Sequence, residues 1–278
     1  MPELPEVETE RRRLAAAIAG KRIAAARVDD ARLTRPEDPQ IVAGMLTGDR
    51  VVAVDRRGKY IVVRLESGHA LLVHLRMTGG FRYAPATHER AVLELDDGSR
   101  VAYRDTRRFG TWLLTEEGDA RHLLSVKNGP EPLGRAFTTD FLAGRLAGRK
   151  APLKAAVLDQ RTVAGLGNIY ADEALWYARL DPLRPAGELE QHEIVRLRDG
   201  IRKALKLGIE RQGADLGDGA YAGGRMQDEF RVYGREGEPC LRCGTPIVKA
   251  RVGGRGTRYC PKDQAASRPS RSRRQSSV

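Results

Sequence analysis

The sequence predicts an α+β protein of several domains: an N-terminal helix with an antiparallel β-sandwich, then a helical domain, then a small β-hairpin module that carries cysteines. Three observations predict it. Short β-type runs fill residues 21–115, helical patterns fill residues 139–210, and all three cysteines lie between residues 240 and 260. Short strands at this spacing are typical of an antiparallel sandwich or barrel. With 278 residues, the chain is long enough for two domains.

The first predicted element is a helix over residues 5–20. Pro5 suits the first turn of a helix, where its missing N–H group has no partner to lose. Glu6 and Glu8 bring negative charge to the positive N-terminal end, and Gly20 is placed to end the helix. This helix would hold the first residues of the chain at a fixed point.

The tripeptide Met1-Pro2-Glu3 before this helix allows two interpretations. Proline at position two is small enough for the initiator methionine to be removed, which would make Pro2 a free secondary amine. An α-amino group has a pKa of about 8, so a useful fraction is unprotonated near neutral pH and can attack a sugar or carbonyl carbon. Glu3 beside it can carry protons. Taken alone, however, the tripeptide is better explained as a helix start, and with Met1 attached Pro2 cannot react.

A series of short strands follows within the N-terminal domain, which we place at residues 1–127. Apolar runs alternate with turn residues such as Arg57-Gly58, Ser67-Gly68 and Asp96-Asp97-Gly98. The runs lie at residues 51–54, 60–65, 70–75, 91–95, 101–103 and 111–114.

Residues 128–138 are rich in turn formers and are predicted to link this domain to a helical one at residues 139–228. Its helices are expected at 139–147, 152–159, 168–178 and 188–207, followed by a glycine-rich mobile loop at 213–228. Residues 229–264 form the cysteine-bearing module. The Ser/Arg-rich tail at 265–278 cannot bury a core, and we expect it to be disordered.

The cysteine spacing predicts a metal site. Cys240-x2-Cys243 is separated by sixteen residues from Cys260-x2-Asp263. Two pairs with two-residue gaps indicate zinc, and a carboxylate can replace a thiolate as the fourth ligand. We therefore expect one zinc ion on Cys240, Cys243, Cys260 and Asp263, held more weakly than by four thiolates because sulfur is the stronger donor. The alternative is a hairpin kept by packing alone, with three free thiols.

The segment Gly165-Leu166-Gly167-Asn168 lies between two predicted helices. It matches neither a phosphate-binding Walker loop nor a dinucleotide fingerprint. A tight turn at a helix N-terminus does gather backbone N–H groups and an amide side chain, which favours a phosphate site. The alternative is that Asn168 only caps the helix that follows, and both roles can hold together.

The charge balance favours a polyanionic partner. The net charge is +12, of which four positive charges lie in the tail, and nucleic acid is a better candidate than an anionic membrane. No apolar run is long enough to span a bilayer, and the acidic N-terminus is unlike a signal peptide. We expect a cytoplasmic monomer, associated with the nucleoid through DNA.

In their order along residues 1–264, these motifs resemble the bacterial formamidopyrimidine-DNA glycosylases. The resemblance is carried by Pro2-Glu3-Leu4-Pro5-Glu6-Val7-Glu8, Arg57-Gly58-Lys59-Tyr60, His74-Leu75-Arg76-Met77, Arg107-Arg108-Phe109-Gly110, Gly165-Leu166-Gly167-Asn168-Ile169-Tyr170-Ala171-Asp172-Glu173 and the cysteine module. Leu4-Pro5 favours this branch over the endonuclease VIII branch, which typically has glycine before that proline. The resemblance implies an N-terminal helix with a β-sandwich, a helix–two-turns–helix domain and a zinc finger, with duplex DNA crossing the cleft between the domains.

The resemblance also implies an activity: a bifunctional glycosylase and abasic-site lyase of base excision repair that removes 8-oxoguanine and formamidopyrimidines from duplex DNA. Pro2 would form a Schiff base with the sugar, and β/δ-elimination would cut the strand. Glu3 would move protons at the sugar, and Lys59 would assist catalysis, although alone it would be taken for an exposed turn lysine. Arg255, rather than the nearby Arg258, would bind a phosphate beside the lesion.

Further residues match DNA-contacting positions of the family. Met77, Arg107 and Phe109 would fill the gap that an everted base leaves in the stack. The other DNA contacts implied are His74, His88, Arg149, Lys150, Lys154 and Asn168. Without the resemblance, Met77 would be assigned to a core, and His74 and His88 to structural roles. The loop at 213–228 matches the segment that covers the everted base, and it departs most from the family pattern.

Two other functions stay open. One is an endonuclease VIII-like glycosylase for oxidised pyrimidines, and the other is a non-catalytic paralogue that binds damaged DNA. Pro2, Glu3 and Lys59 together argue against the second, since binding alone does not need them. Asp263 favours it, because a loosened finger could misplace Arg255. The tail would either add salt-dependent DNA affinity or act as a solubilising extension.

Overall fold

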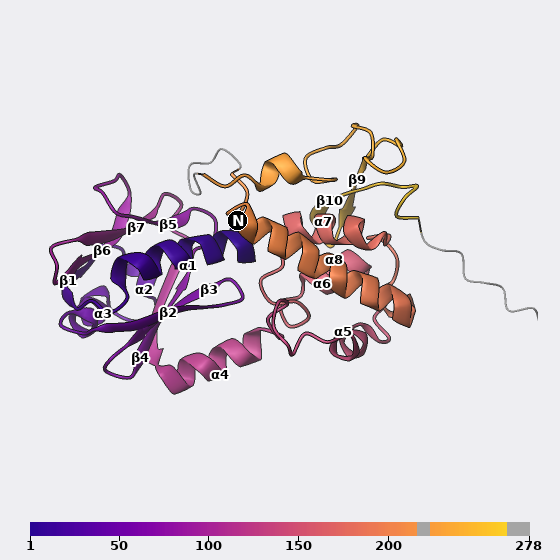
Figure 1. Ribbon diagram of the computed structural model, residues 1–278. Coiled ribbons are helices and arrows are strands. Elements are labelled where there is room, and N and C mark those ends of the chain that lie inside the picture. The colour runs from indigo at the N-terminus through magenta and orange to yellow at the C-terminus, as the bar shows by residue number, and fades with distance from the viewer. Residues whose placement is uncertain (216–222, 266–278) are drawn as a thin grey trace, which may run out of the picture.

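Two four-stranded sheets make up most of the N-terminal half of the chain (Figure 1). The computed structural model describes residues 1–215 and 223–265. One sheet has the order β2-β3-β4-β8 and the other β1-β6-β7-β5, with antiparallel neighbours throughout. The strands are β1 (Ile23–Val28), β2 (Val51–Arg57), β3 (Tyr60–Leu65), β4 (His69–His74), β5 (Gly79–Arg82), β6 (Glu89–Leu95), β7 (Arg100–Asp105) and β8 (Thr111–Glu116). The predicted antiparallel sandwich is confirmed.

Strand β3 shows how the sequence makes this sandwich. Its residues alternate between half-buried and buried, because successive side chains of a strand point to opposite faces. Ile61 and Val63 enter the main apolar core, to which both sheets contribute. Tyr60 and Val62 face a smaller apolar cluster on the other side of the sheet, which helix α4 (Glu117–Lys127) covers.

Three helices in this half were not predicted: α2 (Ala31–Thr34), α3 (Pro39–Leu46) and α4. The side chains of Asp30 and Asp38 cap α2 and α3, and Pro39 lies in the first turn of α3. Asp followed by Pro is a helix-start signal, so α3 could have been read from the sequence. Helix α4 has no side-chain cap at its start, and it offers no comparable signal.

Helix α1 (Leu4–Ile18) belongs to two cores. Val7, Leu14 and Ile18 pack in the core of the sandwich, whereas Leu4 is fully buried in a second core formed by the helices of the C-terminal half. The sequence placed this helix at residues 5–20, close to the observed bounds. The helix therefore joins the two halves at its first turn.

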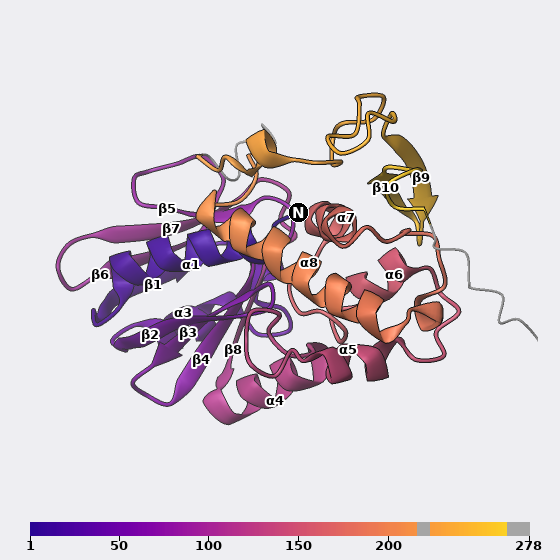
Figure 2. The ribbon, with the colours of Figure 1, turned by 45° about the vertical axis from the view of Figure 1, so that its right-hand side comes forward.

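The second core is built by four helices, with α8 lying between α7 and α5 (Figure 2). These are α5 (Thr139–Leu146), α6 (Leu153–Leu158), α7 (Asn168–Ala178) and α8 (Gln191–Glu210), with short 3-10 turns at Ala186–Glu188 and Met226–Glu229. They correspond to the four predicted helices, and the largest differences are at the ends of α8. Part of the predicted loop 213–228 (residues 216–222) and nearly all of the predicted tail (266–278) lie outside the described residues.

The last element is an antiparallel hairpin of β9 (Val248–Val252) and β10 (Arg255–Tyr259). A small core of Trp176, Val232, Ile247, Cys240 and Cys260 attaches it to the C-terminal end of α7. No helix within residues 1–215 and 223–265 is long and apolar enough to cross a membrane.

Candidate active site

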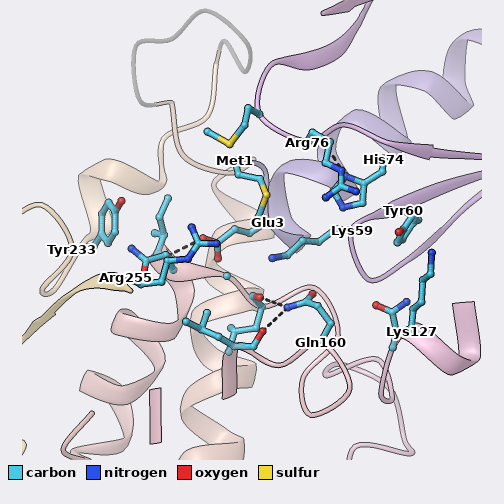
Figure 3. Close-up of a pocket in the computed structure, with 17 residues that line it drawn as sticks. Met1, Glu3, Lys59, Tyr60, His74, Arg76, Lys127, Gln160, Tyr233 and Arg255 are labelled. Carbon is cyan, nitrogen blue, oxygen red and sulfur yellow. Dashed lines mark hydrogen bonds between the residues drawn. The ribbon is translucent and has the colours of Figure 1, made fainter. Parts of the chain in front are cut away.

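A cavity of about 540 Å³ lies where the N-terminus of α1, the β2–β3 turn, the start of α7 and the β9–β10 hairpin meet (Figure 3). Each of these segments contributes one or more polar side chains. The predicted site residues that line it are Glu3, Lys59, His74, Met77, Asn168 and Arg255. Met1 also lines it, and Pro2 is buried next to Glu3. The structure thus brings together Glu3 and Arg255, which are 252 positions apart in the chain.

Glu3 caps a helix from the other half of the molecule. Its Oε1 accepts a hydrogen bond from the N–H of Ile169 at 2.8 Å, and its Oε2 accepts one from the N–H of Tyr170 at 3.3 Å. The positive end of α7 therefore faces a carboxylate, which is the favourable arrangement. Burial raises the pKa of Glu3, while Lys59 and the two backbone bonds oppose that rise. This carboxyl therefore keeps its proton at a higher pH than an exposed one does, which suits it to proton transfer near neutral pH.

Two glycines allow this approach of α1 to α7. A Cβ atom on Gly167 would lie 2.3 Å from Cδ of Glu3, and one on Gly165 would lie 2.7 Å from Cβ of Leu4. Gly165 also has φ +80°, a conformation that side chains rarely adopt. Gln160 holds the same turn by donating to the carbonyl of Leu166 and accepting from the N–H of Gly165. The glycines of this motif thus serve close packing around Glu3.

Lys59 is buried, not an exposed turn lysine, with 6% of its surface accessible. The turn that carries it is fixed by Glu131, which accepts from the N–H of Gly58, and by Arg57, which donates to the carbonyl of Gly129. Burial lowers the pKa of Lys59, and the nearby Glu3 and Glu6 oppose this change. A lysine of lowered pKa next to a carboxyl of raised pKa is typical of a site that transfers protons.

Arg255 reaches the cavity from the start of β10, and a buried ion pair holds that strand in place. Nζ of Lys154 lies 2.7 Å from Oδ1 of Asp172 and donates to the carbonyl of Gly256 at 2.8 Å. Oδ2 of Asp172 accepts from the N–H of Arg258 at 3.0 Å. The prediction that Lys154 contacts DNA is corrected by this geometry: its side chain is 0% exposed. An ammonium group removed from water needs a carboxylate partner, and here that partner is Asp172.

Two other cavity residues, His74 and Asn168, differ in their hydrogen bonding. His74 is buried, and its Nδ1 accepts from the N–H of Arg76. Burial lowers the pKa of His74 to about 3, so its ring is neutral at physiological pH. Oδ1 of Asn168 is buried with no hydrogen-bond partner. Asn168 is not the cap of α7, since the N-cap position is Gly167 and Glu3 bonds the free N–H groups.

Other predicted DNA-contacting residues lie outside the lining of the cavity. Arg107 and Phe109 stack on each other, with Cζ of the arginine 5.0 Å from the ring centre. Phe109 is 51% exposed, so its ring is accessible from solvent. Their loop is tied to Asp105, which accepts from the N–H groups of Arg107 and Gly110. His88 is exposed, at φ +63°.

Arg149 and Lys150 lie in the turn between α5 and α6. Arg149 is half-buried and pairs with Asp159 at 3.4 Å, whereas Lys150 is exposed. Lys150 is thus the freer of the two to meet a phosphate.

The sequence reasoning missed Glu6 as a site residue. Its Oε1 accepts from the hydroxyl of Tyr170 at 2.7 Å and from the N–H of Ala214 at 2.8 Å, and its Oε2 accepts from the N–H of Glu3 at 2.8 Å. Burial, reinforced by the neighbouring Glu3, raises the pKa of Glu6 to about 7. The spacing of Glu3 and Glu6 is that of a capping box, which could have revealed the reciprocal bond. No sequence pattern predicts the contacts of Glu6 with Tyr170 and Ala214.

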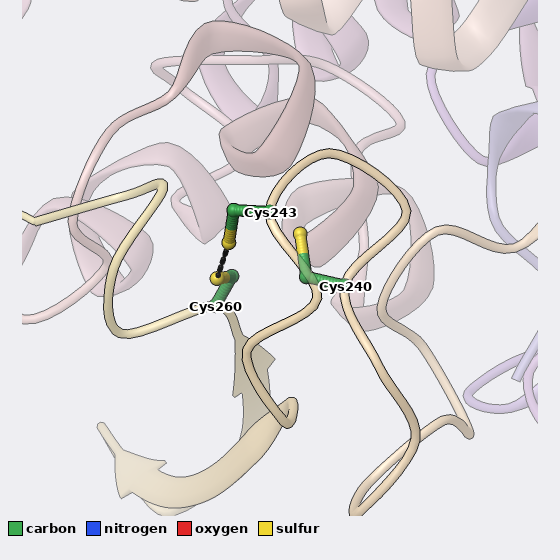
Figure 4. Close-up of side chains that lie close together, drawn as sticks. All are labelled: Cys240, Cys243 and Cys260. Carbon is green, nitrogen blue, oxygen red and sulfur yellow. Dashed lines mark hydrogen bonds between the residues drawn. The ribbon is translucent and has the colours of Figure 1, made fainter.

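The three cysteines form one cluster (Figure 4). Sγ atoms of Cys240, Cys243 and Cys260 all lie within 4.8 Å of one another, and those of Cys243 and Cys260 are 3.4 Å apart. A disulfide would be much shorter, at about 2.05 Å. Tetrahedral zinc with bonds of about 2.3 Å has sulfur–sulfur edges of roughly 3.8 Å, which this spacing approaches. The cluster therefore fits a zinc ion.

Asp263 does not belong to this cluster. Its Oδ2 accepts from Nη1 of Arg242 at 2.6 Å, and Arg179 lies 3.7 Å from its Oδ1. The expected fourth ligand is thus turned toward arginine, because a short charge-assisted hydrogen bond satisfies a carboxylate that is only 10% exposed.

Comparison with family models places the whole chain among similar proteins. The formamidopyrimidine-DNA glycosylase N-terminal domain matches residues 1–112, the formamidopyrimidine-DNA glycosylase H2TH domain matches residues 128–218, and a zinc finger found in FPG and IleRS matches residues 237–266. The chain is 45% identical over 273 residues to a formamidopyrimidine-DNA glycosylase of Roseiflexus, covering 95% of this chain and all of the relative. It is 44% identical over 272 residues to that of Thermus thermophilus, covering 95% of this chain and 98% of the relative.

Solved structures show the same fold. The MutM (FPG) protein of Thermus thermophilus superposes with a TM-score of 0.86 at 42% identity, over 96% of this chain and all of that one. A Lactococcus lactis FPG variant in complex with Fapy-dG containing DNA superposes with a TM-score of 0.89 at 36% identity, over 95% of this chain and all of that one. The Lactococcus lactis protein has also been solved with abasic site containing DNA, with a TM-score of 0.88 at 36% identity, over 95% of this chain and all of that one.

Proposed function

The chain belongs to the formamidopyrimidine-DNA glycosylase family, and on this basis we propose how its own residues carry out the reaction. The protein is a base-excision-repair DNA glycosylase for oxidised purines, and abasic-site lyase activity is typical of its family. Its partner is duplex DNA that contains lesions or abasic sites. The roles of individual residues are our inference from the cavity.

We propose that Pro2, freed from Met1, is the nucleophile. The observation that carries this proposal is the position of Glu3: its buried carboxylate lies on the N-terminus of α7, in the same cavity as Lys59 and next to Pro2. With Met1 removed, the nitrogen of Pro2 is a secondary amine that can attack C1′ of an everted nucleotide. The bond between C1′ and the base breaks, and its electron pair leaves with the base, which takes up the proton that the nitrogen of Pro2 loses on forming the C1′–N bond.

Glu3 then acts on the sugar. As the C1′–O4′ bond opens, Glu3 gives a proton to O4′, and the nitrogen of Pro2 becomes an iminium. The positive charge acidifies the C2′ hydrogen. Removal of that proton expels the 3′ phosphate, and a second elimination expels the 5′ phosphate. Lys59, whose pKa burial lowers, is a suitable proton carrier for these steps.

The remaining residues bind DNA. Arg255 and Asn168 would bind phosphates near the reacting sugar, and the partnerless Oδ1 of Asn168 supports a polar ligand there. Met77, Arg107 and Phe109 would fill the gap in the base stack, supported by the exposed Arg107–Phe109 pair. His74, His88, Arg149 and Lys150 would add backbone contacts. Zinc on Cys240, Cys243 and Cys260 would hold the hairpin that presents Arg255.

A trapping experiment tests the nucleophile. The protein is incubated with a duplex carrying 8-oxoguanine in the presence of borohydride, and the N-terminal peptide of the adduct is sequenced. We expect a stable adduct at Pro2 and none at Pro2 in protein that retains Met1, because the nitrogen of Pro2 is then an amide, while a thymine glycol duplex reacts more slowly. An adduct on Lys59, or none at all, would overturn the assignment.

We further propose that the protein works as a monomer in the cytoplasm, on the DNA of the nucleoid. The absence of a membrane-crossing helix from the described residues agrees with this location. Size measurement of the purified protein with and without a lesion duplex tests the monomer.

A further inference from the structure

The zinc finger has a second set of contacts that the cysteines do not make. Arg242 lies between Cys240 and Cys243, and its Nη1 donates to Oδ2 of Asp263 at 2.6 Å. The same nitrogen donates to the carbonyl of Trp176 at 2.7 Å, and the guanidinium lies 3.6 Å from the centre of the Trp176 ring. One side chain thus joins both halves of the finger to the end of α7.

The contacts of Arg242 with Trp176 and Asp263 are of types that stabilise a folded protein. The carbonyl of Trp176 is in the last turn of α7, at the negative end of that helix, where a cation stabilises it. Stacking of a guanidinium on a tryptophan ring adds a cation–π attraction. Both charged side chains are largely buried, with 22% and 10% exposed for Arg242 and Asp263. Moving Asp263 onto a metal would remove the anion that pairs with this buried cation.

The second half of the finger has its own ties. Gln264 accepts from the N–H of Cys260 and donates to the carbonyl of Leu180. The N–H of Asp263 points at Sγ of Cys260, 3.3 Å away, as expected for a donor to a thiolate. The backbone of Asp263 thus contacts a metal ligand while its side chain turns to Arg242.

We propose that this finger holds zinc through only three protein ligands, the thiolates of Cys240, Cys243 and Cys260. The fourth coordination position takes a small exogenous donor such as water or imidazole. The Arg242–Asp263 ion pair then links the two halves of the finger in place of a fourth protein ligand. Zinc in proteins is four-coordinate, and three protein ligands leave one position for solvent. Cys243 is half-exposed, so that position can be reached from solvent.

Cobalt substitution of the full-length protein tests the ligand count. The sulfur-to-cobalt charge-transfer intensity is expected to be equal in the wild type and Asp263→Asn, and roughly one third higher in Asp263→Cys, since four thiolates replace three. Titration with imidazole should shift the visible bands of the wild type and Asp263→Asn, but not those of Asp263→Cys. An imidazole-insensitive wild-type spectrum would overturn the proposal.

Zinc affinity and stability give two readouts independent of catalysis. Asp263→Asn should change the zinc Kd by less than about threefold, well below the 10–100-fold cost typical of losing an outer partner of a metal ligand, because its side chain bonds Arg242 and not a thiolate. A larger loss would make Asp263 a ligand. Arg242→Gln and Asp263→Asn should each lower Tm, and the double variant should lower it no further than the worse single one. Additive shifts would rule out the ion pair as the link.

Discussion

Glu3 accepts a hydrogen bond from the backbone N–H of Ile169, 166 positions further along the chain, at 2.8 Å. The third residue of the chain thereby caps α7, a helix of the C-terminal half. The carboxyl group that we assign to proton transfer is also a structural contact between the two halves. Its chemical and structural roles can be separated by substitutions.

Asp or Gln in place of Glu3 would not be equivalent, and Glu3→Gln is the sharper test. The amide keeps the size of the side chain, and its oxygen can still accept from Ile169, so the loss of stability should be about 1 kcal/mol. Excision of 8-oxoguanine in single-turnover assays should fall by about 10²–10⁴-fold, because the amide cannot transfer a proton. Glu8→Gln, which breaks only ion pairs with Arg11, Arg12 and Arg56, is the matched control. Equal activity of the two variants would exclude Glu3 from proton transfer.

Gly167→Ala tests the close approach of α1 to α7. The added Cβ would lie 2.3 Å from Cδ of Glu3, so Glu3 must move. We expect a loss of about 1–3 kcal/mol of stability in urea unfolding, together with reduced excision. Gly144→Ala in α5 is the control, since nothing lies within 4 Å of its Cβ, and it should stabilise the protein by about 0.5–1 kcal/mol. A neutral Gly167→Ala would contradict the packing described.

The buried carboxyl of Glu6 predicts a stability that falls as pH rises. Its pKa is raised from 4.5 to about 7 in the folded protein, mainly by burial. Between these values the folded state keeps a proton that the unfolded state has lost, so stability decreases by about 3 kcal/mol over that interval. Urea unfolding at several pH values should show a shallower decrease for Glu6→Gln than for the wild type. The exposed Glu66→Gln should follow the wild type; parallel curves for all three proteins would disprove the assignment.

Salt dependence of DNA binding separates Lys150 from Lys154. Lys150 is exposed and can neutralise a phosphate, whereas Lys154 is fully buried against Asp172. Lys150→Ala should therefore reduce the slope of log K against log salt by about 0.9. Lys154→Met should leave the slope unchanged but destabilise the protein by about 3–5 kcal/mol, because Asp172 loses its partner. The double variant Lys154→Met/Asp172→Leu should recover part of that stability. A reduced slope for Lys154→Met would restore it as a phosphate contact.

Local patterns in the sequence were sufficient for much of the fold. The bounds of α7 were predicted because Gly167 precedes an uninterrupted helical stretch that begins at Asn168, and α1 was recognised from Pro5 and the acidic first turn. Helix α4 could not be recognised in the same way, since it follows β8 directly and starts without a capping side chain. The sequence thus predicts those helices that begin or end at a residue typical of a helix terminus, such as proline or glycine.

Site residues could be predicted only where they belong to a sequence motif. The family resemblance predicts Glu3, Lys59 and Arg255 as site residues, and all three line one cavity. Lys154 was misplaced because its partner Asp172 is eighteen positions away and nothing local marks the pair as buried. Asp263 was assigned to zinc by its spacing alone, yet spacing does not reveal that Arg242 competes for the same carboxylate.

The first turn of α1 has a mechanical consequence. Leu4 is packed in the core of the helices and Val7 in the core of the sandwich, so less than one helical turn separates the two bodies. A shift of one half against the other would strain the contacts at this turn first, because a helix is stiff over so short a length. Glu3 lies directly before the turn, so its position is set by both cores at once. A substitution that loosens either core is therefore expected to be felt at the carboxyl of Glu3.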